Sequence, residues 1–199
     1  MGFTYRNNLT CIVLSVIVVL MGIEIVYLIR QNRRLLKIIS NPIPVHQTLE
    51  PGAVVPPFSA PDLDGYTVAF DYGPDQPHRL LLWFSSTCPA CLDNLNLWND
   101  LFYEFASEDL QVIGISTGDP EDTRALAAEY GLVFPVLTLN DPPIVEAYKG
   151  FSRPQTVLVG PEGRIRRLWP GSLSREQQAS LTAELTAIHT LSGKGGDLQ

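Results

Sequence analysis

Hydrophobic and polar positions along the chain follow the periods of short strands and amphipathic helices. Residues 79–85 form a near-continuous apolar run, which is typical of a central strand covered on both faces. Between residues 92 and 105, apolar side chains recur every three or four positions, and this predicts a helix over about 89–106. A second apolar run at 110–116 and a helical segment between Asp119 and Gly131 follow. This order predicts two parallel strands joined by a right-handed crossover.

The other predicted elements are shorter. Asp64-Gly65 separates two strand-like segments, 58–63 and 66–70, and predicts a β-hairpin. We also expect a short strand at 134–137, a short helix at 142–148, an antiparallel pair at 156–159 and 164–169, and a last helix from Ser174. Residues 192–199 are predicted to be a disordered tail. The predicted class is α/β, a central mixed β-sheet with helices on both faces.

The N-terminal part has a different pattern. Residues 9–29 are apolar apart from two hydroxyl side chains and Glu24, and as a helix they would span about 32 Å, the thickness of a bilayer core. Arginines follow this stretch instead of a small-residue cleavage site. We therefore expect a tail at residues 1–8, an uncleaved transmembrane helix at 9–30, a juxtamembrane helix and linker at 31–50, and the folded domain at 51–191.

Charge is distributed unevenly. Residues 1–49 hold five basic side chains and one acidic, whereas residues 50–199 hold nine basic and twenty acidic, a formal charge of −11. A domain this acidic is a poor partner for nucleic acid, because phosphate neutralisation needs clustered Lys and Arg. The arginines that follow the apolar stretch favour a cytoplasmic domain by the positive-inside rule.

Cys88 and Cys91 stand where the first apolar run meets the first helix. Residues i and i+3 of a helix share a face at about 5–6 Å, which suits a disulfide, and the helix N-terminus stabilises a thiolate at Cys88. The pattern indicates dithiol–disulfide exchange, with Cys88 as the nucleophile and Cys91 as the resolving cysteine. The alternative is a packing pair or half of a zinc site, but the sequence has no second C-x-x-C or His cluster. We expect no metal or other cofactor.

Three segments carry a family resemblance: the strand–Cys88-Pro89-Ala90-Cys91–helix unit, residues 57–68, and residues 153–165. Over about residues 50–190 the chain resembles the thioredoxin superfamily, especially its membrane-anchored TlpA/ResA-like branch and the thiol oxidoreductase-like accessory proteins of methylamine utilisation. The resemblance implies a thioredoxin-like fold, a cis-proline at Pro154 beside the cysteines, and substrate contacts from Pro154, Arg153 and Thr87. It implies protein thiol or disulfide substrates, a redox partner protein, and an extracytoplasmic (periplasmic) domain, opposite to the charge rule.

The chain departs from the family pattern at several positions. Leu82 stands where thioredoxins often carry a buried Asp, and Arg153 stands where Thr or Val is common before the cis-proline. We expect the Arg153 cation to lie near Cys88 and lower its pKa. Two other functions stay open: a copper-delivery or assembly factor, whose usual spacing is C-x-x-x-C, and a peroxiredoxin-like peroxidase, whose P-x-x-x-T/S-x-x-C motif would need proline at Leu81.

Overall fold

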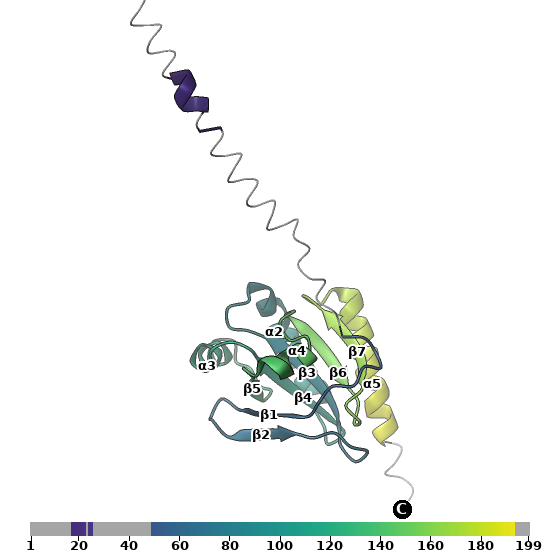
Figure 1. The fold of residues 1–199 in the computed structure, drawn as a ribbon. Coiled ribbons are helices and arrows are strands. Elements are labelled where there is room, and N and C mark those ends of the chain that lie inside the picture. The colour runs from purple at the N-terminus through teal and green to yellow at the C-terminus, as the bar shows by residue number, and fades with distance from the viewer. Residues whose placement is uncertain (1–16, 23, 26–48, 194–199) are drawn as a thin grey trace, which may run out of the picture. The chain divides into compact units, whose positions relative to one another are not determined.

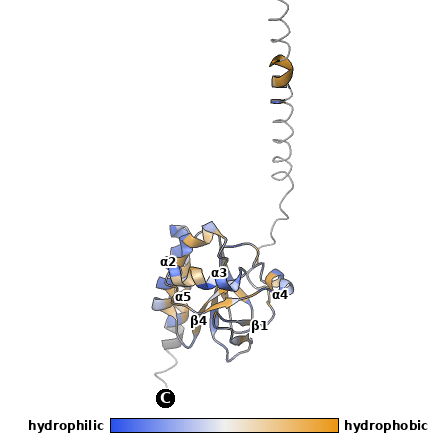
Figure 2. Cartoon of the chain, turned by 90° about the vertical axis from the view of Figure 1, so that its left-hand side faces the viewer, coloured by the Kyte–Doolittle hydropathy of each residue, from blue (hydrophilic) through white to orange (hydrophobic). Residues whose placement is uncertain are grey.

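The computed structural model of this chain describes residues 17–22, 24–25 and 49–193, in two units that are considered separately. In the first unit, residues 17–22 and 24–25 are helical with exposed apolar side chains, and Figure 2 shows the short helix in the hydrophobic colour. No helix within the described residues is both long and apolar enough to cross a membrane. Most of the predicted anchor at residues 9–30 and of the linker at 31–50 lies outside the described residues.

A five-stranded mixed sheet forms the centre of the second unit, in the order β5-β4-β3-β6-β7 (Figure 1). Its strands are β3 (His78–Phe84), β4 (Leu110–Ser116), β5 (Val136–Thr138), β6 (Gln155–Val159) and β7 (Ile165–Pro170). The first three are mutually parallel, and β6 and β7 are antiparallel to their neighbours. A separate antiparallel hairpin consists of β1 (Phe58–Pro61) and β2 (Thr67–Phe70). The mixed sheet, the parallel β3–β4 pair and the hairpin at Asp64-Gly65 are confirmed.

Helices cover both faces of this sheet, as predicted. They are α2 (Pro89–Phe105), α3 (Pro120–Glu129), α4 (Pro142–Ala147) and α5 (Arg175–Gly193). Alternate side chains of β3 enter two apolar clusters, because successive residues of a strand point to opposite faces. Leu80 and Leu82 pack with side chains of α2, α3 and α5, while Leu81 and Trp83 pack with the hairpin and α4. The last helix reaches Gly193, so it extends past the predicted start of the tail at Ser192, and residues 194–199 lie outside the described residues.

The helix that follows the cysteines is fixed firmly on the sheet. One face of α2 is buried along its whole length, through Cys91, Asn94, Leu95, Trp98, Leu101 and Phe105. In the middle of this face the Trp98 indole Nε1 donates a 3.0 Å hydrogen bond to Thr156 Oγ1 of β6, and both groups are buried. Since Pro154 lies directly before β6, this bond fixes the position of the cysteine-bearing helix relative to the proline segment.

Candidate active site

Cys88 and Cys91 form a disulfide at the start of α2, with their Cα atoms 5.4 Å apart. Cys88 is the N-cap residue of the helix and is half-buried, whereas Cys91, one turn further in, is fully buried. The Cys88 N–H donates to the Ser85 carbonyl at 3.1 Å, so the four residues between β3 and α2 form a tight turn. The disulfide therefore stands at the carboxyl end of the central strand, with only its first sulfur near the surface.

The N-terminus of α2 is uncapped. Its first turn holds no acidic residue, and no side chain caps its free N–H groups. The first acidic residue of the helix, Asp93, lies in the second turn, where its Oδ2 is 3.0 Å from Ser172 Oγ. Pro89 occupies the first turn, where its missing N–H is not needed. The helix dipole and the free N–H groups are therefore available to stabilise a thiolate at Cys88 when the disulfide is reduced.

The proline segment lies against this disulfide. The Arg153–Pro154 peptide bond is cis, Pro154 is buried, and the Arg153 carbonyl oxygen is 3.9 Å from Cys88 Sγ. The Pro154 carbonyl accepts a 2.8 Å hydrogen bond from the N–H of Gly171, in the loop that joins β7 to α5. The structure thus brings Pro154 and Cys88 together, as the family resemblance implied.

The loop after β7 also holds the start of α2, and sequence reasoning missed this contact. The buried Asn94 amide donates to the Gly171 carbonyl at 3.1 Å and accepts from the Leu173 N–H at 2.9 Å. Ser172 Oγ donates to the Ala90 carbonyl at 3.2 Å. The signal in the sequence was an amide three residues after Cys91, on the buried face of the predicted helix.

Thr87 and Arg153, the two other residues predicted to contact substrate, differ in exposure and in their partners. Thr87 is exposed, and its Oγ1 lies 3.1 Å from Ser85 Oγ. Arg153 is half-buried, and its guanidinium donates to Thr117 Oγ1 in the loop after β4. Burial lowers the pKa of Arg153 below its ordinary value. Since it is the carbonyl of Arg153 that contacts Cys88, the expected effect of its cation on the Cys88 thiol stays a prediction.

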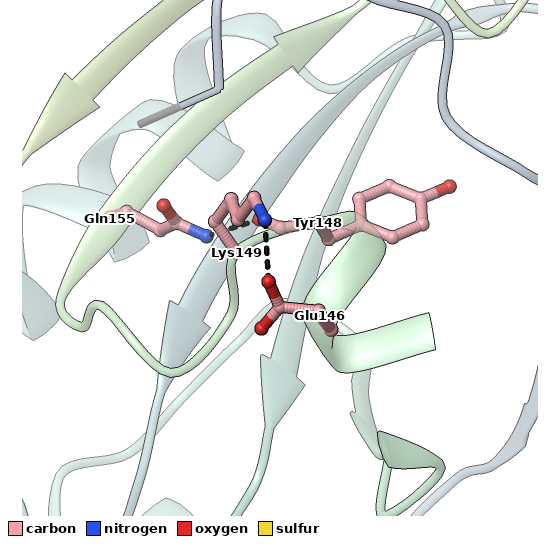
Figure 3. Close-up of polar contacts among 4 residues, drawn as sticks. All are labelled: Glu146, Tyr148, Lys149 and Gln155. Atoms are coloured by element: carbon pink, nitrogen blue, oxygen red, sulfur yellow. Dashed lines mark hydrogen bonds and ion pairs between the residues drawn. The ribbon is translucent and has the colours of Figure 1, made fainter. Parts of the chain in front are cut away.

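Hydrogen bonds and an ion pair hold both ends of the segment 148–155, which contains Arg153 (Figure 3). Gln155 Nε2 of β6 donates to the Tyr148 carbonyl at 2.9 Å, and both residues are buried. On the other side of the turn, Lys149 pairs with Glu146 of α4 and has a positive φ of 51°. The segment between Tyr148 and Gln155 is therefore a closed loop with fixed ends, which presents Arg153 and Pro154 to the disulfide.

No cluster of three or more His, Cys, Asp or Glu side chains suited to hold a metal ion occurs within the part of the chain that the structure describes. His78 is the first residue of β3, at the end of the strand far from the disulfide, and His189 lies late in α5.

Three comparisons with known proteins bear on this arrangement. Residues 51–168, more than half of the chain, match the model of the AhpC/TSA family. The chain belongs to the AhpC/TSA family. A Mycobacterium tuberculosis protein whose name places it with the peroxiredoxins is 30% identical over 121 residues, covering 59% of this chain and 75% of that protein. The thiol-disulfide oxidoreductase ResA of Geobacillus thermodenitrificans is 22% identical, covering 63% of this chain and 72% of ResA.

The crystal structure of the thioredoxin domain of a thiol-disulfide oxidoreductase from Bacteroides vulgatus superposes on the AhpC/TSA domain with a TM-score of 0.57, at 20% identity, over 69% of this chain and 98% of that chain. At this identity the likeness shows the fold, and the fold is thioredoxin-like. The prediction of a thioredoxin-superfamily protein of the TlpA/ResA-like branch is confirmed.

Proposed function

We propose that this AhpC/TSA-family protein is a thiol–disulfide oxidoreductase that exchanges disulfides with protein substrates through Cys88 and Cys91. The observation that carries the proposal is the asymmetry of the pair beside a cis-proline. Cys88 is half-buried at an uncapped helix N-terminus, next to Pro154, while Cys91 is fully buried one turn away. The name and likeness of ResA support the same chemistry.

The exchange has two steps. In the reducing direction, the Cys88 thiolate attacks one sulfur of a substrate disulfide, forming a mixed disulfide and releasing the other substrate sulfur as a thiolate. The Cys91 thiolate then attacks Cys88 Sγ, which re-forms the bond present in this structure and releases the second substrate sulfur. Two electrons pass from the cysteine pair to the substrate, and a dithiol partner protein must supply them again. The oxidising direction is the reverse of these steps.

The sequence has a third cysteine, Cys11. The test uses the full-length chain carrying Cys11→Ser, so that only the two site cysteines react. With glutathione disulfide as the probe, reduced Cys91→Ser should accumulate a mixed disulfide at Cys88, because no second thiol remains to release it. Cys88→Ser should accumulate almost none, because Cys91 is buried. Mass spectrometry of the intact protein measures both. Equal capture by the two variants, or faster alkylation of Cys91 than of Cys88 by iodoacetamide, would show that the nucleophile is wrongly assigned.

A peroxidase is the second candidate, favoured by the mycobacterial relative that is 30% identical. In that reaction, Cys88 would take one oxygen from a peroxide to form a sulfenic acid, release water or an alcohol, and then condense with Cys91 to form the same disulfide with loss of water. Leu81, which replaces the proline of the peroxidase motif, counts against it. Loss of hydrogen peroxide in the presence of dithiothreitol, faster with the wild type than with Cys88→Ser, would favour the peroxidase.

We further propose that residues 9–30 anchor the protein in the cell membrane and that the domain lies on the periplasmic side. The apolar stretch supports the anchor, the resemblance to the membrane-anchored TlpA/ResA-like branch supports the periplasmic side, and the charge rule opposes that side. Alkaline phosphatase and a fluorescent protein that matures only in the cytoplasm, each fused to the C-terminus, separate the two sides. An active phosphatase fusion with a dark fluorescent fusion is the expected result, and the opposite pair places the domain in the cytoplasm.

A further inference from the structure

Arg153 is a half-buried cation that pairs with no carboxylate in the part of the chain that the structure describes. The three ion pairs within the described residues join Lys149, Arg164 and Arg167 to glutamates, and none includes Arg153. Its guanidinium donates to the neutral hydroxyl of Thr117. Burial lowers the pKa of Arg153 below its ordinary value. A cation held partly out of water without a counter-ion is a cost to the fold, and an arriving anion would relieve that cost.

This cation lies at the same edge of the sheet as the disulfide. The Thr117 N–H donates to the carbonyl of Phe84, the last residue of β3, at 3.1 Å. Because Thr117 Oγ1 accepts a hydrogen bond from the Arg153 guanidinium, this guanidinium is held over the carboxyl ends of β3 and β4. The carbonyl of the same arginine is 3.9 Å from Cys88 Sγ. The backbone carbonyl of Arg153 thus lies against the Cys88 sulfur, while its side chain contacts the loop after β4.

Arg153 belongs to none of the ion pairs within the described residues, although the domain as a whole is acidic. Residues 50–199 carry a formal charge of −11. Yet the first turn of α2 has no acidic residue, and Asp119, two residues beyond Thr117, accepts through Oδ1 from the N–H groups of Glu121 and Asp122 at the start of α3. The helix N-terminus and the guanidinium are thus two positive features at the disulfide. A substrate with negative charge beside its cysteine matches them.

We propose that Arg153 is a specificity residue that selects substrate segments carrying an acidic side chain next to the reacting cysteine. The proposal rests on the thiol–disulfide exchange proposed above and names the substrate class for it. Arg153 contributes a planar guanidinium, which forms paired hydrogen bonds with a carboxylate. The preferred segment therefore carries an acidic residue next to its cysteine.

The test compares three otherwise identical peptides whose cysteine is flanked on both sides by Glu, by Gln or by Lys. Each cysteine carries a pyridyl disulfide, because the released 2-thiopyridone is neutral and coloured. The reduced full-length Cys11→Ser chain attacks the peptide sulfur, and the release rate gives a second-order rate constant. We expect the Glu peptide to react about three- to tenfold faster than the Gln peptide, as a partly buried charge pair allows. The Lys peptide should be the slowest.

Substitutions at Arg153 separate recognition from activation of the nucleophile. A change in Cys88 reactivity alters the three rates together and cancels in their ratio. Arg153→Gln should lower the Glu-to-Gln ratio to the part that the helix N-terminus alone gives, Arg153→Lys should keep more of it, and Arg153→Glu should make the Lys peptide the fastest. Arg164→Gln is the matched control, because Arg164 is exposed in the β6–β7 turn at the opposite end of β6 from Pro154, and it should leave the wild-type ratio unchanged.

The possible outcomes are distinct. A wild-type ratio near one, or a ratio that Arg153→Gln leaves unchanged, overturns the selection by Arg153 while leaving the exchange reaction in place. Release from none of the three peptides, with both cysteines reduced, contradicts the proposed exchange itself and this inference with it. Reversal of the preference by Arg153→Glu is the result that a purely structural role of Arg153 would not give.

Discussion

Gly150 is a position where one added methyl group should disturb the active-site loop. A Cβ at this residue would lie 2.2 Å from Cζ3 and 2.4 Å from Cε3 of Trp83, whereas carbon atoms prefer a separation of about 3.5–4.0 Å. The Trp83 ring cannot retreat into solvent, because the residue is 0% exposed and lies in the central strand. Nor is the loop free, since the Gly150 N–H donates to the Val145 carbonyl at 2.8 Å.

We therefore expect Gly150→Ala to lower the free energy of unfolding by about 3 kcal/mol, the upper end of the range for overpacked cores. Backbone strain plays no part, because φ at Gly150 lies outside the left-handed region. Gly73→Ala is the matched control: its nearest side-chain atom, Gln76 Cγ, would be 4.0 Å away. That change should be neutral or stabilise by up to about 1 kcal/mol, because alanine restricts the unfolded chain. Urea denaturation measures both.

A second substitution tests the cause. Trp83→Phe removes the ring atoms that the new methyl group would meet, and it breaks no hydrogen bond, because the buried Trp83 Nε1 has no partner. Alone it should cost about 1–3 kcal/mol through the lost contacts. Combined with Gly150→Ala, the total loss should be at least about 1 kcal/mol smaller than the sum of the single losses. Additive losses would refute the clash with Trp83 as the origin of the effect.

Two further predictions concern buried polar groups. Tyr148 keeps its proton, because burial raises its pKa, and its hydroxyl donates to the Pro56 carbonyl at 2.7 Å while lying 2.6 Å from the Tyr72 hydroxyl. In urea denaturation, Tyr148→Phe should lower the free energy of unfolding by about 1–3 kcal/mol, because the Pro56 carbonyl and the Tyr72 hydroxyl both lose the Tyr148 hydroxyl. Tyr72→Phe should cost less, about 0.5–1.5 kcal/mol. Equal costs would contradict this network. The pKa of His78 is lowered, first by burial and then by the charge of Arg166. The unfolded chain therefore binds more protons at this residue than the folded chain does. The free energy of unfolding should accordingly fall as the pH drops below about 6.5. His78→Gln should flatten this part of the pH profile of unfolding, and an unchanged slope would exclude His78 as its source.

Much of this fold could be predicted from local patterns. The apolar run at 79–85, the hairpin signal at Asp64-Gly65 and the cap at Asp119 each determine a short segment by themselves, and the structure contains each of these elements. The buried positions Leu181, Leu185 and Ile188 of α5 likewise follow from helical spacing. Patterns of this kind succeed because burial on one face of an element is recorded in its own sequence.

The contacts around the disulfide depend on residues far apart in the chain, and the sequence predicted them less well. The resemblance placed Pro154 beside Cys88, but no local signal joined Asn94 to Gly171, or Thr117 to Arg153. Each of these bonds depends on how two loops meet at the end of the sheet. The direction of the Arg153 guanidinium was similarly beyond sequence reasoning, because the spacing of residues fixes the backbone position of a side chain and leaves its rotamer open.

The absence of an acidic group beneath the cysteines has a consequence for the exchange reaction. Among the residues whose burial the structure describes, no aspartate or glutamate is buried, and Cys91 packs in an apolar cluster with Leu82. The hydroxyl of Thr156 already accepts the Trp98 N–H nearby. Within the described residues, the Cys91 thiol therefore has no buried carboxylate to take its proton. In the proposed exchange we expect an acceptor on the surface side of the pair, beside Cys88, to take this proton before Cys91 attacks Cys88 Sγ.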